Sequence, residues 1–559
     1  MSESASRAEP EAPSTGGRGA LSHREIMTVL AGLMLGMLLA ALDMTIMASA
    51  TKTIADQLHG QTIQAWVTTA YLITATISTP LYGKLSDIFG RKPMYLTAIT
   101  LFLTGSVLSG MANSMYELAA FRAVQGLGAG GLMSLALAII ADMVSPRQRS
   151  RYQGYFMGVW GISSVAGPVV GGFFAGAGTV FGIDGWRWVF LVNVPIGIIA
   201  LIVVAKFLNV PHKRVQHRVD YWGAGALTVA LVPLLIVAEQ GREWGWGSGR
   251  SLLMYVIGVV GVIAFIMIER LMGDEALLPM RLFRRPVFSL TNVINFVMGL
   301  GMFGMMMSLP LYLQIVKGAT PTESGLLTLP MTAGILVAAM GSGILISKTG
   351  RYKRFPLFGL AIVSASMFLF AQIGVDTPMW QTMIVMALAG TGLGLCMQTL
   401  ILAIQNDVPA RDMGVATSSA TFFRSIGGTV GTAVFLSILF SVVGSRIADA
   451  FASVRTDPAF LAALQQNPEF AQQLKGGGSS LDLNNTEFLN QIDPTLARPI
   501  LTGFADSIDT VFMVGGFVTL VAFVLMWFLK EVPLSDKSGI QRAADDEAAA
   551  EAAPPAAVH

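Results

Sequence analysis

Two opposite charges stand inside apolar, helix-length segments, and their placement points most directly to chemistry. Asp43 is the only ionisable side chain in the segment 27–51, and Arg122 is the only one in the segment 118–141. Each segment can cross about 30 Å of hydrocarbon at about 1.5 Å per residue. A charge at such a depth costs roughly 2.5–3.5 kcal/mol on the insertion scale, so it normally faces a cavity or an opposite charge. Both residues are therefore candidates for a functional site inside a membrane.

Asp43 is our candidate for proton coupling. Removal from water disfavours the ionised form of a carboxyl group, which brings it toward the range where it can take up and release a proton. The permanently protonated Arg122 would oppose this effect if the two side chains lie close together. Two simpler interpretations stay open. Asp43 could serve only to bond neighbouring helices, and the side chain of Arg122 could reach the membrane surface.

The composition is that of a membrane protein. Of the 559 residues, 53% are hydrophobic and only 13% are charged, whereas an ordinary soluble domain has about 25% charged residues. The net charge is only +2, and the positive residues are distributed among many loops rather than gathered in one patch. We therefore expect no nucleic-acid partner. The single cysteine, Cys396, excludes an internal disulfide and a cysteine metal site.

Apolar runs bounded by charged residues recur fourteen times, and hydropathy predicts a membrane-spanning helix for each. The segments are 27–51, 61–83, 93–116, 118–141, 152–176, 188–205, 221–238, 251–268, 288–316, 324–347, 355–375, 378–405, 415–444 and 510–529. The first resembles a secretory signal in part. It is too long, contains an acid and precedes many further apolar segments, so we expect it to be retained.

The distribution of Lys and Arg orients these helices. With the N-terminus in the cytoplasm, the inner loops hold nineteen Lys and Arg residues and the short outer loops hold five. Cytoplasmic loops carry an excess of positive residues in membrane proteins. We therefore predict that both termini are cytoplasmic and that the chain crosses the cytoplasmic (inner) membrane many times.

The chain is expected to divide into five parts. These are a disordered tail (1–24), a six-helix bundle (25–210), two inserted helices (211–285), a second six-helix bundle (286–530) and another disordered tail (531–559). The second bundle includes a long outer loop, 445–508, in which helical patterning over 447–474 precedes a GGGSS break at 476–480. We expect a small, partly helical cap there, with a plain spacer as the alternative.

Two stretches of the first half recur in the second half. GKLSDIFGR at 83–91 follows the second helix, and GILISKTGR at 343–351 follows the tenth, with Ser347 where the first copy has Asp87. At nearly the same separation, QGLG at 125–128 is paired with TGLG at 391–394. Helices 1–6 and 9–14 are thus predicted to be two copies of one unit. Two halves around a midplane site form the architecture of rocking transporters.

Several motifs resemble one family of transporters. The segment 83–91 resembles the loop signature of the major facilitator superfamily. Other segments are similar to its fourteen-helix drug:proton antiporters, namely LDMTI at 42–46, Arg122 with QG at 125–126, AGPVVGG at 166–172, WRWVF at 186–190 and NVP at 193–195. The resemblance covers roughly residues 25–530. It implies an all-α integral membrane protein in which two six-helix bundles plus two inserted helices make 14 transmembrane helices, and it implies that Arg122 takes part in proton relay.

The loop after the second helix is expected to act as a conformational latch together with Arg91. Gly83 and Gly90 permit close backbone approach. Asp87 can accept hydrogen bonds from a helix N-terminus or from basic residues of the opposite half. The second copy lacks this acid, since it has Ser347, so the two loops are expected to contribute unequally.

Helix 5 carries the antiporter motif. Gly167, Pro168 and Gly171 would bend this helix and let it pack closely against a neighbour, and close packing without any role in transport is the alternative. In helix 13 the matching stretch has no proline, and Arg424 beside it is a second candidate for a buried charge.

Some side chains could contact a substrate. Methionines such as Met302 and Met306 are flexible and polarizable, which suits a wall that repacks around different apolar ligands. Phe156 and Trp160 could stack on a flat or cationic ligand, and Gln125 adds a polar group. Ordinary packing is the alternative for the methionines.

These features together predict a proton-coupled antiporter that exports apolar, neutral or monocationic drugs or antibiotics by alternating access and handles dications poorly. Its partners would be the small-molecule substrate, protons and the lipid bilayer, with no cofactor and no metal. No GxxxxGK[ST] loop and no Ser/His/Asp arrangement is present, so we expect neither ATP as the energy source nor an enzyme.

Other functions stay open at this point. A transporter of the same fold could export an endogenous lipid, siderophore or envelope precursor, with loop 445–508 docking an outside adaptor or lipoprotein. A facilitator would use no proton, and a membrane sensor or scaffold would bind without flux.

Overall fold

The computed structural model describes residues 23–59, 64–208, 220–467, 492–535 and 541. Each of the fourteen predicted segments falls on a helix of this structure. Within the described residues, twelve helical segments are long and apolar enough to cross a membrane by length and composition, and α14 is apolar but shorter. Most of both predicted tails, and the GGGSS break at 476–480, lie outside the described residues.

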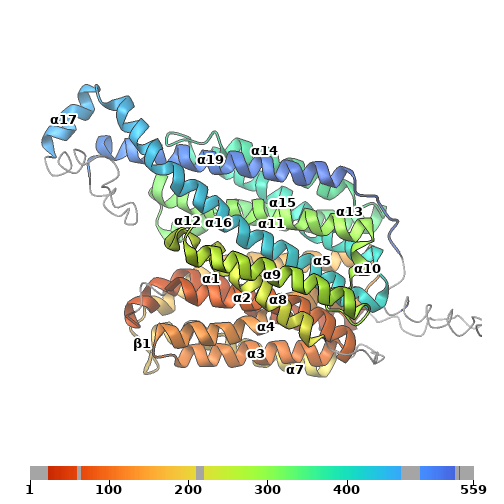
Figure 1. Ribbon diagram of the computed structural model, residues 1–559. Coiled ribbons are helices and arrows are strands. Elements are labelled where there is room, and N and C mark those ends of the chain that lie inside the picture. Colours follow the sequence, from red (N-terminus) through yellow and green to blue (C-terminus); the bar gives the residue numbers. More distant parts are fainter. Residues whose placement is uncertain (1–22, 60–63, 209–219, 468–491, 536–540, 542–559) are drawn as a thin grey trace, which may run out of the picture.

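The first helices pack into one bundle, which is red to orange in Figure 1. It consists of α1 (His23–Gln57), α2 (Gln64–Phe89), α3 (Arg91–Met111), α4 (Met115–Met143), α5 (Pro146–Gly176), α6 (Trp188–Leu191) and α7 (Asn193–Phe207). A short hairpin of β1 (Thr179–Val180) and β2 (Ile183–Asp184) leads through the 3₁₀ turn η2 (Gly185–Arg187) into α6. We call this the N-bundle.

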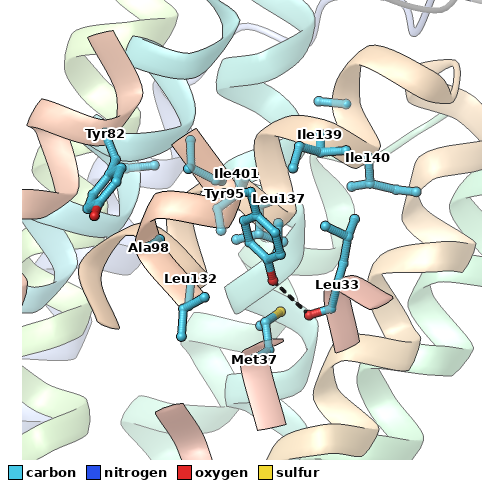
Figure 2. Close-up of a cluster of buried hydrophobic side chains, with 14 of the residues drawn as sticks. Leu33, Met37, Tyr82, Tyr95, Ala98, Leu132, Leu137, Ile139, Ile140 and Ile401 are labelled. Carbon is cyan, nitrogen blue, oxygen red and sulfur yellow. Dashed lines mark hydrogen bonds between the residues drawn. The ribbon is translucent and has the colours of Figure 1, made fainter. Parts of the chain in front are cut away.

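The interior of the N-bundle is a continuous apolar cluster. Leu33 and Met37 of α1, Tyr95 of α3 and Leu132 of α4 meet there (Figure 2), and each is at most 3% exposed. The hydroxyl of Tyr95 donates to the Leu33 carbonyl at 3.0 Å. Because this phenol is satisfied inside the cluster, α1, α3 and α4 are held together without a charge at this level.

The last helices form a second bundle, green to blue in Figure 1, which we call the C-bundle. It consists of α11 (Pro286–Leu311) with the π-helical turn η3 (Tyr312–Val316), α12 (Pro321–Leu327), α13 (Leu329–Thr349), α14 (Arg354–Phe370), α15 (Met379–Asp407), η4 (Ala410–Asp412), α16 (Met413–Val454), α17 (Pro458–Gln466) and α19 (Pro494–Trp527). Between the bundles, α8 (Tyr221–Trp244) and α9 (Gly249–Met272) pair with each other, and α8 contacts both α2 and α16. The short α10 (Met280–Phe283) follows them.

The repeat is real, but the sequence alignment of helices 4 and 12 was wrong by two residues. A Cβ on Gly126 or Gly130 of α4 would clash with carbonyls of α2, and a Cβ on Gly390 or Gly394 of α15 would clash with carbonyls of α13. Between them, Gly128 faces α3 and Gly392 faces α14. The structure therefore pairs 126, 128 and 130 with 390, 392 and 394. Because the glycines recur at every second residue, a sequence alignment shifted by two residues still pairs glycine with glycine. This explains the error.

The outer loop is shorter than predicted. Helix α16 continues to Val454, ten residues beyond the expected end at 444, and α19 begins at Pro494 rather than at 510. Between them α17 packs against α19, with Phe460 and Ala463 buried. In Figure 1 these elements project past the rest of the bundle. The expected partly helical cap is therefore present over its described part, on longer helices.

The predicted loop at 83–91 is also mostly helix. α2 runs without a break to Phe89, and α3 starts at Arg91, so that only Gly90 lies between them. Gly90 has φ +96°, a conformation that L-residues rarely adopt. We call the end of the molecule that holds this turn, together with the α4–α5 and α13–α14 connections, the basic end.

Candidate functional site

The two charges singled out by the sequence form an ion pair. Arg122 of α4 approaches Asp43 of α1 with an Nη1 to Oδ2 distance of 2.5 Å, and the side chains are 1% and 0% exposed. The Nε2 of Gln125 donates to the other oxygen of Asp43 at 2.8 Å, and the Oε1 of Gln125 accepts from Arg122 at 2.7 Å. The three side chains form a closed triangle, so neither buried charge is left uncompensated.

A third donor to the acid comes from α7. The amide nitrogen of Asn193 lies 3.2 Å from Oδ1 of Asp43 and 3.1 Å from the hydroxyl oxygen of Ser106. That hydroxyl donates to the Phe190 carbonyl at 2.9 Å. Asn193 was part of the family motif in the sequence, but nothing there placed it at the acid. The one feature of the sequence that could have indicated this role is a polar amide at the start of an apolar helix.

The guanidinium of Arg122 rests on an aromatic ring. Its central carbon lies 4.2 Å from the ring centroid of Tyr71 in α2 and 6.0 Å from that of Phe190. Nε of Arg122 is fully buried and has no hydrogen-bond partner. A cation over an aromatic face is stabilised by about 0.5–2 kcal/mol. Arg122 thus keeps part of its stabilisation even if Asp43 becomes neutral. Nothing in the sequence indicated this contact of Tyr71.

This arrangement can respond to a single proton. With Asp43 ionised, three donors from Arg122, Gln125 and Asn193 converge on it. A proton on the carboxyl group would cancel the charge that holds Arg122 and turn one acceptor oxygen into a donor. Arg122 would then keep the Gln125 oxygen and the ring of Tyr71 as partners. Loss of the negative charge of Asp43 would therefore weaken the contact between α1 and α4 without leaving Arg122 isolated.

The antiporter motif of α5 packs directly on the helix that carries the acid. A Cβ on Gly167 would clash with Thr45 of α1, two residues from Asp43, and the hydroxyl of Thr45 donates to the Ser163 carbonyl at 2.9 Å. The next residue, Pro168, faces Gly325 of α12 in the C-bundle. Helix α5 therefore touches both the acid-bearing helix and the opposite bundle. Gly171 is buried on the same helix.

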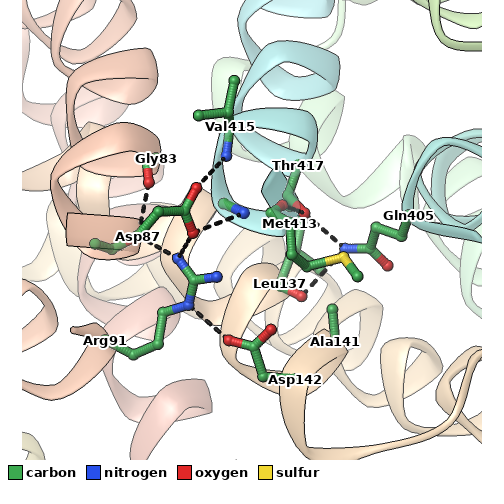
Figure 3. Close-up of polar contacts among 12 residues, drawn as sticks. Gly83, Asp87, Arg91, Leu137, Ala141, Asp142, Gln405, Met413, Val415 and Thr417 are labelled. Atoms are coloured by element: carbon green, nitrogen blue, oxygen red, sulfur yellow. Dashed lines mark hydrogen bonds and ion pairs between the residues drawn. The ribbon is translucent and has the colours of Figure 1, made fainter. Parts of the chain in front are cut away.

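At the basic end, Asp87 joins the two bundles (Figure 3). Its two carboxylate oxygens accept from the backbone N–H groups of Gly414 and Val415, in the first turn of α16, at 3.1 Å each. The N-terminus of a helix favours a negative charge. A Cβ on Gly83 would overlap Ser418 and the Gly414 carbonyl. The predicted acceptance from a helix N-terminus and the predicted close approach at Gly83 are therefore both present.

Arg91 fixes the carboxylate of Asp87 from its own bundle. It forms ion pairs of 2.6 Å with Asp87 and with Asp142 at the end of α4 (Figure 3). Burial raises the pKa of Asp87 to about 6, and the neighbouring charge of Asp142 adds to this, while Arg91 and the N–H of Val415 oppose it. Asp87 thus lies at the end of α2, beyond the predicted span 61–83, and its pKa is raised.

The second copy of the loop makes a different contact. Nε of Arg147 in α5 donates to the Ser347 carbonyl at 2.9 Å, near the C-terminus of α13. The hydroxyl of Ser347 bonds only its own helix, at the Ile344 carbonyl. The Ser150 hydroxyl donates to the Gly343 carbonyl at 2.8 Å. Both loops therefore lie at the contact between the bundles, but only the first uses a side-chain charge of its own.

The candidate substrate contacts are dispersed. Gln125 belongs to the acid site, and Phe156 is fully buried in the apolar cluster of the N-bundle. Met302 is 6% exposed in a C-bundle cluster, whereas Met306 is 40% exposed. Trp160 is partly buried. Among the described residues, no group of three or more His, Cys, Asp or Glu side chains could hold a metal ion.

Comparison with known proteins agrees with this architecture. The family model of the Major Facilitator Superfamily matches residues 33–432. The multidrug transporter protein MdtP of Bacillus subtilis is 33% identical over 542 residues, which cover 95% of this chain and 97% of that protein. A tetracycline resistance determinant of Streptomyces rimosus is 39% identical over 341 residues, or 60% of this chain and 98% of that protein.

A solved structure supports the fold independently. The proton:xylose symporter XylE, bound to 6-bromo-6-deoxy-D-glucose, superposes with a TM-score of 0.58 at 15% identity, over 94% of this chain and 99% of that chain. At this level of identity the likeness concerns the fold alone. The predicted all-α fold of two six-helix bundles with two inserted helices is confirmed, and the chain is a multi-pass membrane transporter that belongs to the Major Facilitator Superfamily.

Proposed function

We propose that the protein is a proton-coupled antiporter that exports apolar drugs or antibiotics, neutral or monocationic, by alternating access. The observation that carries this proposal is the buried triangle of Asp43, Arg122 and Gln125. Relatives named as multidrug transporters and as a tetracycline resistance determinant support the export of drugs. A buried acid with a cation that retains other partners supports the coupling to protons.

The contacts at the basic end indicate which conformation of the proposed transport cycle this structure represents. Asp87 holds the N-terminus of α16, and Nη1 of Arg149 donates to Gln405 of α15 at 2.8 Å. These bonds join the two bundles at one end. The positive-inside distribution assigns that end to the cytoplasm. On this assignment the proposed state is closed on the cytoplasmic side, and both chain termini are proposed to be cytoplasmic.

The proposed cycle couples Asp43 to this closure. A proton from outside neutralises Asp43 and weakens its bond to Arg122. Because Thr45 packs against Gly167 of α5, a shift of α1 moves the helix that contacts the C-bundle. The bundles then rock, the contacts of Asp87 break, and the proton leaves to the cytoplasm while the drug loads between the bundles. Gly90 and Arg91 maintain the turn and the charge pairing on which the latch depends.

Proton flux in everted vesicles tests the proposal. Vesicles that contain the full-length protein should take up an apolar monocationic dye and release protons from their lumen. Asp43→Asn should abolish both signals, because an amide cannot carry a proton. Asp376→Asn is a matched control, since Asp376 is 77% exposed and pairs with Arg498 at the opposite end. Uptake that persists unchanged in Asp43→Asn would contradict the proton site.

The projecting elements favour one alternative. Helix α17, seated on the extensions of α16 and α19, could dock an outside adaptor or lipoprotein for export of an endogenous lipid, siderophore or envelope precursor. Replacing residues 455–493 by a short flexible linker separates the two functions. Dye efflux should survive the replacement if the protein is a drug exporter, whereas partner-dependent export should not.

A further inference from the structure

A tight helix contact places Arg424 toward the interior of the C-bundle. Along α16, Cβ atoms added at Gly427 and Gly431 would clash with the carbonyls of Phe296 and Leu300 in α11. The two helices thus run in parallel register with their backbones close together. Arg424 lies one turn before Gly427, and its own carbonyl lies against Gly299. Its side chain therefore starts from the face of α16 that meets α11.

Arg424 has no counter-ion in the part of the chain that the structure describes. Among the described residues it forms no ion pair, its Nη1 is fully buried, and that atom has no hydrogen-bond partner. The residue as a whole is only partly buried. Arg122, by contrast, has Asp43 at 2.5 Å. An uncompensated charge at this depth normally faces a cavity or a ligand.

Asn292 of α11 lies two turns before Gly299, which contacts Arg424. Side chains of a helix tilt toward its N-terminus, so the guanidinium of Arg424 extends back along α11, toward the turn that precedes Phe296. Asn292 occupies that turn on the same face as Phe296 and Gly299. It is 2% exposed, and neither atom of its amide has a partner. An amide buried without partners is rare in folded proteins.

Gln398 of α15 forms the third side. Gln405 donates to the hydroxyl of Thr417 at 2.9 Å, which fixes the register between α15 and α16. Gln398 and Arg424 each lie seven residues, or two helical turns, further toward the opposite end from this bond. Gln398 is 8% exposed and its Oε1 is unpartnered. Three polar side chains with unused hydrogen-bonding groups thus lie at matching heights on three helices that contact one another.

We propose that Arg424, Asn292 and Gln398 form a subsite for an acidic group, such as a carboxylate, of the transported molecule. A guanidinium offers up to five N–H donors in a planar fork that matches a carboxylate. The amides of Asn292 and Gln398 can add donors from the two facing helices. A cationic group would be repelled from the same position. The subsite has no acid of its own in α11, α15 or α16 between Pro286 and Leu311, Met379 and Asn406, or Met413 and Gly444.

This inference rests on the proposed function and narrows its substrates. Drugs that are neutral because they are zwitterions would place their acidic group at Arg424, while the proton is handled at Asp43 in the other bundle. Transport of the acidic form of a drug should therefore depend on Arg424, whereas transport of its ester should not.

A matched pair of dyes tests the subsite. Rhodamine B is a zwitterion with a free benzoate, and rhodamine 6G is a closely related monocation whose benzoate is an ethyl ester. Uptake of each dye is measured in everted vesicles that contain wild-type protein, Arg424→Gln, Arg424→Lys or Asn292→Asp. The half-saturating concentration of rhodamine B should rise at least about tenfold in Arg424→Gln, because charge-assisted hydrogen bonds are lost. That of rhodamine 6G should change by less than about twofold.

Two further variants exclude a merely structural role for Arg424. Arg424→Lys keeps the charge and should recover part of the rhodamine B uptake. Asn292→Asp supplies an internal carboxylate to the guanidinium, so it should weaken rhodamine B uptake as strongly as Arg424→Gln while thermal stability in detergent is maintained or increased. A stable Asn292→Asp protein with normal rhodamine B uptake would overturn the proposal.

The outcomes also separate the subsite from the function itself. If wild-type vesicles transport rhodamine 6G but discriminate against rhodamine B, or if Arg424→Gln slows both dyes equally, the acidic subsite is wrong and the antiporter stands. If wild-type vesicles transport neither dye while the protein is folded and inserted, the proposed drug export fails and the subsite fails with it.

Discussion

The two bundles share one packing scheme but differ in their charges. Gly126 and Gly130 of α4 pack on α2 as Gly390 and Gly394 of α15 pack on α13. In this register Met386 and Ala389 stand where the N-bundle has Arg122 and Gln125, and α11 contains no acid. The paired charges therefore belong to one copy of the repeat alone.

The C-bundle has the opposite arrangement. Nη1 of Arg424, Oε1 of Gln398 and both amide atoms of Asn292 lack partners there, whereas Arg122, Gln125 and Asn193 all donate to Asp43. The closed hydrogen-bonded network around Asp43 can change its bonding when the acid takes up a proton. The unpartnered groups of Arg424, Asn292 and Gln398 can bind a ligand. We therefore propose that the two copies of the repeat have different roles, with proton binding in the N-bundle and substrate recognition in the C-bundle.

The largest effect is expected at the closed network. Asp43→Asn should reduce proton-coupled dye uptake to the background of empty vesicles. It also leaves Arg122 buried without its counter-ion, which destabilises a protein by about 3–5 kcal/mol, although the ring of Tyr71 should reduce this loss. Uptake and thermal unfolding in detergent are measured together. A double variant, Asp43→Asn with Arg122→Gln, should recover stability but not transport; recovery of both would break the division between the bundles.

The next effect compares the two loops at the basic end. Asp87→Asn should slow turnover about tenfold or more, because the amide offers one acceptor oxygen where Gly414 and Val415 each donate to a separate oxygen, and a buried donor left without a partner costs about 1–3 kcal/mol. Ser347→Ala should change turnover by less than about twofold, since this hydroxyl bonds only its own helix. Initial rates of dye uptake at saturating dye distinguish the two variants. If the two variants slowed turnover equally, the two loops would not differ in their contribution to the latch.

A third prediction tests the packing that the bundles share. Gly126→Ala and Gly390→Ala should each lower the free energy of unfolding by about 1–3 kcal/mol, because the added methyl group meets a backbone carbonyl. Gly172→Ala is the matched control, since nothing lies within 4 Å of a Cβ there. Thermal unfolding of the detergent-solubilised proteins measures all three. If only one of the first two variants is destabilised, the structural register of the repeat is not symmetric.

The smallest effect concerns pH at the latch. Burial raises the pKa of Asp87 to about 6 from the model-peptide value of 3.8, so the state in which Asp87 is buried binds a proton more tightly than an exposed state. Its stability relative to the open state is therefore greatest at low pH and is lost as pH rises through about 6. Acidification from pH 7.5 to 5.5 should favour the closed basic end about fourfold.

Distance measurements between spin labels across the basic end report this pH dependence. The relevant quantity is the difference between wild type and Asp87→Asn, because other groups titrate in both proteins. A pH response that is identical in the two would assign the effect to another residue.

The sequence predicted the charged half of this comparison well. A lone acid and a lone Arg in apolar helices are visible without coordinates, because burial of charge is costly wherever the helix packs. Asp87 was predictable for a similar reason, since an acid between two glycines near a helix end suits a helix N-terminus. The helical state of residues 83–89 was not, because glycines suggested a loop where they serve close packing.

The uncharged half could not be predicted. Asn193, Tyr71, Asn292 and Gln398 are common polar or aromatic residues whose role depends on which helix faces them. Only the three-dimensional register shows that Asn193 completes the acid site and that Asn292 lacks partners. The two-residue error in the glycine ladder has the same origin, because spacing alone does not say which helix each glycine touches.

Proton release on substrate binding tests the central claim most directly. Purified full-length protein in weakly buffered detergent is mixed with rhodamine 6G, and the protons released are measured for wild type, Asp43→Asn and Arg424→Gln. Release from wild type and from Arg424→Gln, with none from Asp43→Asn, is the predicted result, because the proton resides in the N-bundle. Undiminished release from Asp43→Asn, or its loss in Arg424→Gln, would contradict the division of roles between the two bundles.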